Sequence, residues 1–271
     1  MKIRLPDIEV LQKKTRSILA DSDPASIRRK LVELFGFYEI INFPLGYDWP
    51  IWRVRKCNDG EGYGNLREIS YPPPEQTRAG RLNNAGQPVL YTSLHNFTAL
   101  TEVGAEEGDY LHIIGFQIKP PEKLRCAIIG EIFNTHRSGR AKLCEALGDG
   151  LNKILNNSDN RASRSWVFLD AFFSMLLADK TAASSDYIYS RIVADLINEK
   201  MPHIDAIYYM SVALDNGVNL AIKPDAVNRL LQVSGTSVIK INRKYDYGIY
   251  DFSMERNLTI RMPDGSIYWK K

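Results

Sequence analysis

The feature that most constrains the fold of this chain is its irregular mixture of short apolar runs and longer helical patterns. The apolar runs are rich in β-branched and aromatic residues, as strands are, whereas residues 141–200 read as helix in three pieces broken near NNSDN and TAASSD. A doubly wound sheet would need a regular alternation of strands and helices, which this order lacks. The sequence therefore predicts an α+β fold. The internal runs predicted as strands are IWRVR (51–55), PVLYT (88–92), LHIIGFQI (111–118), CAIIGEIF (126–133) and IDAIYYMS (204–211), which is followed by the run NLAI.

The N-terminal region is predicted to be helical. Residues 7–20 form one helix, and a second begins at Pro24, where Asp23 suits the N-cap and proline suits the first helical position. Gly36 is a suitable end for this second helix. We expect these helices to form an extension over residues 1–50 that serves as a lid, a packing lobe or a partner surface.

Three further segments complete the prediction. Residues 96–106 and the run DAVNRLLQV (225–233) have helical patterns, and residues 58–79 read as a long loop. From residue 237 the chain reads as β structure. It includes a Pro-Asp-Gly turn at 263–265, where glycine accepts the positive φ that a hairpin turn needs.

Composition excludes several classes of protein. The net charge of the 271 residues is only +3, so no basic field indicates direct nucleic-acid binding. The most apolar window, residues 166–178, contains Asp170 and falls short of the roughly 20 residues that span a bilayer, so it is predicted to be a buried helix. Three cysteines without metal-type spacing fit reduced thiols, and the N-terminus shows no secretory signal. We expect a cytoplasmic protein without membrane contact.

Familiar catalytic motifs are missing from the sequence. It contains no GxxxxGK[ST], GxGxxG, HExxH or GxSxG pattern. None of its four histidines has a second histidine or a cysteine at ligand spacing. We therefore expect neither a metal site nor a Ser-His hydrolase.

The stretch GRLNNAGQPVLYTSLHNFTALTE, residues 80–102, carries a cation, a ring and a carboxylate: Arg81, Tyr91 and Glu102. Arginine binds phosphate through two donors, tyrosine stacks on flat heterocycles, and a carboxylate binds ribose hydroxyls or a developing sugar cation. NAD presents a matching pyrophosphate, base and ribose. Cleavage of its nicotinamide–ribose bond releases a neutral ring, so it does not strictly need a general acid. The same residues could instead be a turn arginine bonded to carbonyls, strand packing and a structural ion pair.

This stretch resembles the RES-domain family, the toxin halves of bacterial RES/helix-turn-helix toxin–antitoxin pairs. The family has an arginine in a Gly-Arg-aromatic-Asn turn, a tyrosine in a Leu-Tyr run and then a glutamate, although Leu82 stands here in place of the aromatic residue. The resemblance extends over about residues 50–240. It adds Arg53 from IWRVR, Ser211 from the end of IDAIYYMS and Asn219 from the following NLAI.

The resemblance implies a core like that of ADP-ribosyltransferases, with a split β-sheet around an NAD cleft. The corresponding domain would span residues 51–271, with a helical insertion at about 135–185. The resemblance also implies NAD as the substrate, degraded by water or by phosphate, and a helix-turn-helix antitoxin protein as a partner. A homodimer remains open.

The resemblance assigns a role to each candidate residue. Arg81 is expected to contact the pyrophosphate or the nicotinamide-side phosphate. Tyr91 is expected to stack in the nicotinamide part of the cleft, and Glu102 to contact the ribose and the developing cation. The resemblance also implies that Arg53, Ser211 and Asn219 bind the substrate. For Arg53 a buried arginine paired to an acid is the alternative, and for Ser211 a cap on a turn.

Two other functions stay open at this point. A mono-ADP-ribosyltransferase would use the same cleft and pass the ribosyl cation to a protein acceptor. A non-catalytic module would keep the fold and bind a nucleotide or a partner.

Overall fold

The computed structural model describes residues 5–261 and 265–269 and divides into two compact units. Unit 1 comprises Met1–Asn42, Gly80–Asn83 and Ala127–His203. Unit 2 comprises Phe43–Ala79, Asn84–Cys126 and Ile204–Lys271.

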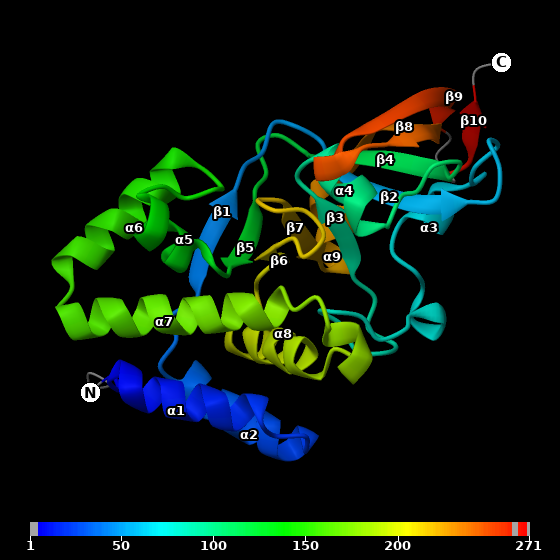
Figure 1. Ribbon diagram of the computed structural model, residues 1–271. Helices are drawn as coiled ribbons and strands as arrows, with labels where there is room; N and C mark the ends of the chain where they lie inside the picture. Colours follow the sequence, from blue (N-terminus) through cyan, green and yellow to red (C-terminus); the bar gives the residue numbers. More distant parts are fainter. Residues whose placement is uncertain (1–4, 262–264, 270–271) are drawn as a thin grey trace. The chain divides into compact units, whose positions relative to one another are not determined.

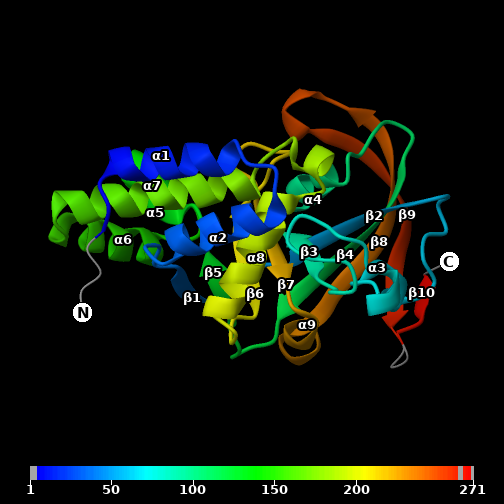
Figure 2. The ribbon, with the colours of Figure 1, turned by 90° about the horizontal axis from the view of Figure 1, so that it is seen from below.

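Unit 1 is helical. The N-terminal helices α1 and α2 pack on α7 and α8, and they lie beside them in both views (Figures 1 and 2). The predicted helices at 7–20 and 24–35 are confirmed, and the Asp23 side chain accepts from the backbone N–H of Ser26 at 2.9 Å as an N-cap. The helices of this unit are α1 (Ile8–Leu19), α2 (Pro24–Phe35), α5 (Glu131–Ser138), α6 (Glu145–Asn157), α7 (Asn160–Leu177) and α8 (Ile188–Lys200), with a 3-10 turn η2 (Ala182–Ser185).

Asp170 anchors the core of unit 1. The apolar window around it lies in α7, which confirms the predicted buried helix, and its carboxylate is fully buried. It accepts from the hydroxyl of Tyr38 and from the backbone N–H groups of Gly130, at 2.9 Å, and Phe133, at 2.8 Å. A buried carboxylate is tolerated here because donors surround it.

The strand predicted over residues 126–133 is wrong in its second half. Strand β5 (Leu124–Ile128) stops there, and α5 begins at Glu131. Gly130 has φ of +97°, a left-handed conformation that ends the extended run and favours glycine. The Glu131 carboxylate then accepts the backbone N–H groups of Lys142 and Leu143, both at 2.9 Å, which fixes the start of the helix.

Unit 2 holds most of the sheet, apart from the ends of β1 and β5 that belong to unit 1. Within the described residues, ten strands run in the order β1-β5-β6-β7-β3-β2-β4-β8-β9-β10. Figure 1 shows β2, β4, β8 and β9 side by side. Besides β5, the strands are β1 (Ile41–Leu45), β2 (Ile51–Cys57), β3 (Leu90–Ser93), β4 (Tyr110–Ile118), β6 (Ala206–Met210), β7 (Val218–Ile222), β8 (Leu231–Lys244), β9 (Tyr250–Arg261) and β10 (Ile267–Trp269).

Most predicted strands are confirmed, and the differences have local causes. Strand β1 contains Pro44, which concealed it in the sequence. Residues 231–233, predicted as helix, pair with 116–118 in the sheet, so the helix α9 (Pro224–Leu230) stops before them. The Pro-Asp-Gly turn falls largely outside the described residues, because 262–264 are not among them. Strands β9 and β10 on either side of it do pair antiparallel.

Short helices connect the strands of unit 2. Helices α3 (Leu66–Ile69) and the 3-10 turn η1 (Pro74–Gln76) lie within the predicted loop 58–79, and η3 (Asp246–Gly248) joins β8 to β9. Helix α4 (Asn96–Glu102) packs Ala99 and Leu100 into a cluster with Val54, Ile113 and Ile239 of the sheet. This packing places Glu102, the last residue of α4, over one face of the sheet. The α+β class is confirmed.

The strand register assigns side chains to the two faces of the sheet. Ser93 pairs with Asn219 on one side and with Trp52 on the other, and side chains of directly paired residues share a face. Tyr91, two residues before Ser93, shares that face. Arg53, next to Trp52, therefore projects from the opposite face.

Candidate functional site

The site is built around the carboxylate of Glu102 in unit 2. Its Oε1 atom accepts a hydrogen bond from the hydroxyl of Ser211 and another from the side-chain amide of Asn219, both at 2.6 Å. Glu102 itself is exposed, whereas Asn219 is only 3% exposed. A buried donor thus holds one oxygen of an accessible carboxylate, and among the described residues nothing bonds to Oε2.

Ser93 fixes the orientation of the Asn219 amide. The Ser93 hydroxyl donates to Asn219 Oδ1 at 2.7 Å, and both side chains are buried. Since Oδ1 accepts this bond, the Nδ2 group is the one that faces Glu102. Ser93 was not among the predicted site residues. The signal for it was its position two residues after Tyr91 on one strand, which puts both side chains on one face.

The hydroxyl of Ser211, just after the end of β6, both donates and accepts hydrogen bonds. Its Oγ atom donates to Glu102 and accepts the backbone N–H groups of Ala213, at 3.1 Å, and Leu214, at 3.0 Å. The turn closes tightly, because a Cβ at Gly217 would lie 2.8 Å from the Ser211 Cβ and 2.7 Å from a methyl group of Thr98. The predicted turn cap and the contact with Glu102 are thus combined in one hydroxyl.

The side chain of Arg53 contacts the backbone carbonyl of Tyr91. Tyr91 is half-buried on the face of Ser93 and Asn219, and its carbonyl accepts from Arg53 Nη1 at 3.2 Å. Arg53 Nε also donates to the carbonyl of Ile69, at the end of α3, at 2.6 Å. Burial, followed by the charge of Arg55, lowers the pKa of Arg53 to about 10. The contacts of Arg53 among the described residues are carbonyls and not an acid.

Arg81 belongs to unit 1, whereas the other five predicted residues belong to unit 2. Its Nη1 donates to the carbonyls of Leu177, at 3.0 Å, and Asp179, at 2.8 Å, and its guanidinium lies 5.4 Å from the centre of the Tyr187 ring. Leu177 is the last residue of α7 and Asp179 lies just beyond it, so neither carbonyl has a partner inside the helix. Arg81 therefore caps the C-terminal end of α7.

The described part of the chain offers neither a site for a metal ion nor a membrane-crossing helix. No group of three or more His, Cys, Asp and Glu side chains there could hold a metal ion. None of the helices it contains combines the length and the apolar character needed to cross a membrane.

Comparison with known proteins assigns a family. No curated protein matches the chain. The family model described as RES domain matches residues 50–240, a range that includes all six predicted site residues and Ser93. This family is generally associated with NAD-related toxin function. Because the match covers more than half of the sequence, the chain belongs to the RES domain family.

Proposed function

We propose that this RES domain protein degrades NAD by cleaving the nicotinamide–ribose bond, with water or phosphate as the acceptor, and acts as a bacterial toxin or defence effector. The observation that carries the proposal is the anchored carboxylate of Glu102, whose Oε1 accepts two bonds of 2.6 Å. Membership of a family associated with NAD-related toxins supports the choice of substrate.

The chemistry follows from how the carboxylate is held. As the bond to nicotinamide breaks, positive charge develops on the ribose and the ring leaves without charge. A carboxylate that is already oriented stabilises that charge without reorganising during the reaction. Ser211 and Asn219 hold Oε1, so Oε2 is the oxygen that would face the ribose. Neither residue acts as a nucleophile in this scheme.

Other residues have supporting roles in the proposal. Tyr91 shares the sheet face of Ser93 and Asn219, which suits a ring that stacks on nicotinamide. The hydrogen bonds of Arg53 to the carbonyls of Ile69 and Tyr91 favour a role in positioning β3. Three further parts of the proposal rest on the family resemblance. They are the contact of Arg81 with the pyrophosphate, the ADP-ribosyltransferase-like cleft, and a helix-turn-helix antitoxin as the partner.

The direct test is nicotinamide release from NAD by the purified protein, with and without phosphate in the buffer. Release that requires phosphate would identify a phosphorylase, and release in both buffers a glycohydrolase. Absence of release from folded protein would contradict the proposal. Transfer of label from NAD to added protein acceptors would then indicate an ADP-ribosyltransferase, and NAD binding without either reaction would indicate a binding module.

A further inference from the structure

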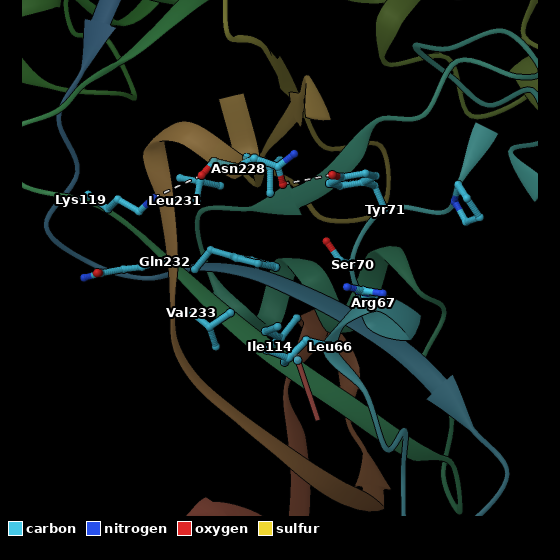
Figure 3. Close-up of a pocket in the computed structure, with 14 residues that line it drawn as sticks. Leu66, Arg67, Ser70, Tyr71, Ile114, Lys119, Asn228, Leu231, Gln232 and Val233 are labelled. Carbon is cyan, nitrogen blue, oxygen red and sulfur yellow. Dashed lines mark hydrogen bonds between the residues drawn. The ribbon is translucent and has the colours of Figure 1, made fainter. Parts of the chain in front are cut away.

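A pocket of about 800 Å³ lies in unit 2 (Figure 3), and Glu102 is not among the residues that line it. Its apolar lining comes from the sheet and from α9, and includes Ile114, Phe116, Val227 and Leu231, which are all buried. Ile114 pairs with Arg53 in the register of β2 and β4, so it lies on the face opposite Tyr91, Ser93 and Asn219. The pocket is therefore separate from the carboxylate site.

Two polar side chains that line the pocket, Tyr71 and Lys119, have hydrogen-bond partners within the protein. Tyr71 donates to Asn228 Oδ1 at 3.1 Å, and Lys119 donates to the carbonyls of Asn228, at 3.3 Å, and Arg229, at 3.1 Å (Figure 3). The Lys119 ammonium is thus committed to the end of α9.

Among the described residues that line the pocket, Arg67 is the cation that remains available to a ligand. It lines the pocket from α3 and is exposed, and no carboxylate of the described residues lies within ion-pair distance of its guanidinium. Figure 3 shows it on the side of the pocket opposite Lys119. A planar guanidinium beside an apolar surface suits a carboxylate, sulfonate or phosphate attached to an apolar body.

We propose that this pocket is a second ligand site, which binds a small organic anion with an apolar body. The apolar lining would hold the body and Arg67 would pair with the acid group. The volume is in the range of about 300–1,000 Å³ found for small-molecule sites, which combine an apolar lining with a few polar groups. This proposal does not depend on the reaction assigned to Glu102.

The test uses two fluorescent probes that differ in one group. The probe 1-anilinonaphthalene-8-sulfonate has a flat apolar body and a sulfonate, and N-phenyl-1-naphthylamine has the same body without the sulfonate. Each is titrated against the wild-type protein and the variants Arg67→Ala, Val233→Trp and Arg16→Ala. Val233 lines the pocket on β8, where tryptophan suits a strand and would obstruct part of the pocket. Arg16 is an exposed helical arginine of α1 and serves as the matched control.

We expect saturable binding of one sulfonate probe per chain. Arg67→Ala should weaken it about tenfold or more, which is typical for a lost bond to a charged group, without changing the affinity for the neutral probe. Val233→Trp should weaken the binding of both probes, and Arg16→Ala should change neither. Near-UV circular dichroism confirms that each variant is folded.

Two results would overturn the proposal. Unchanged binding of both probes by folded Val233→Trp would show that they bind elsewhere. Equal effects of Arg67→Ala and Arg16→Ala on the affinity for the sulfonate probe would rule out a specific contact of Arg67 with the anion. A general loss of positive charge would then explain the change.

Discussion

The hydroxyl of Ser211 donates to the carboxylate of Glu102 at 2.6 Å, although the two residues are 109 positions apart in the chain. Two elements bring them together. Helix α4 packs on the sheet and ends at Glu102, and strand β6 ends just before Ser211. Asn219 on the neighbouring strand β7 completes the arrangement. The site is therefore a product of the sheet topology.

Replacing Ser211 by alanine should lower NAD turnover about tenfold or more, because a hydrogen bond to a charged group is lost from the reacting carboxylate. Ser211→Thr keeps the hydroxyl and should retain most of the activity. The measurement is kcat and KM for nicotinamide release, with thermal unfolding as a check on the turn at 211–217. Equal losses in the two variants would mean that the hydroxyl does not act through Glu102.

Replacing Arg81 by alanine should lower the free energy of unfolding by about 1–3 kcal/mol, since its guanidinium bonds two carbonyls at the end of α7. Denaturant unfolding measures this change, with the exposed Arg16→Ala as control. Unchanged stability would contradict the capping role. If Arg81 also contacts the pyrophosphate, the fraction of Arg81→Ala that remains folded should show a raised KM for NAD.

Acid should destabilise the fold through His112. This side chain is buried, accepts the backbone N–H of Tyr63 at Nδ1 and contacts Thr236 through Nε2. Burial lowers its pKa from 6.5 to about 4. Between these values the unfolded chain binds a proton that the folded protein does not. The free energy of unfolding should therefore rise with pH from about 4 to 6.5, by up to about 3 kcal/mol.

The variant His112→Gln provides the comparison for this pH dependence. Glutamine is uncharged over the whole range, so the part of the slope that comes from His112 should disappear. Urea unfolding at several pH values between 4 and 7 measures it. A variant with the same slope as the wild-type protein would assign the acid sensitivity to other groups.

Much of the fold could be predicted because the patterns were local. The alternation in IWRVR and LHIIGFQI predicted β2 and β4, and Asp23 with Pro24 predicted the start of α2. The failures came from interactions between distant segments. The buried carboxylate of Asp170 binds the amides of Gly130 and Phe133, which turns the end of a predicted strand into the start of α5.

The site was predictable only in part. Glu102, Ser211 and Asn219 could be named from the sequence, but their mutual hydrogen bonds depend on the order of β3, β6 and β7 in the sheet. Ser93 has no motif of its own and is identified by its register with Asn219. Arg53 projects from the face of the sheet opposite Ser93 and Asn219. This also follows from the strand register, which a single sequence does not specify.

The most direct test of the central claim is the variant Glu102→Gln, with the exposed Glu107→Gln as its control. Glutamine keeps an oxygen that can accept from Ser211 and Asn219, so the fold and NAD affinity measured by calorimetry should stay close to wild type. Nicotinamide release should fall by about two to three orders of magnitude, as expected when preorganised stabilisation of the transition state is removed. Glu107→Gln should retain full activity. Turnover near the wild-type value in Glu102→Gln would contradict the account.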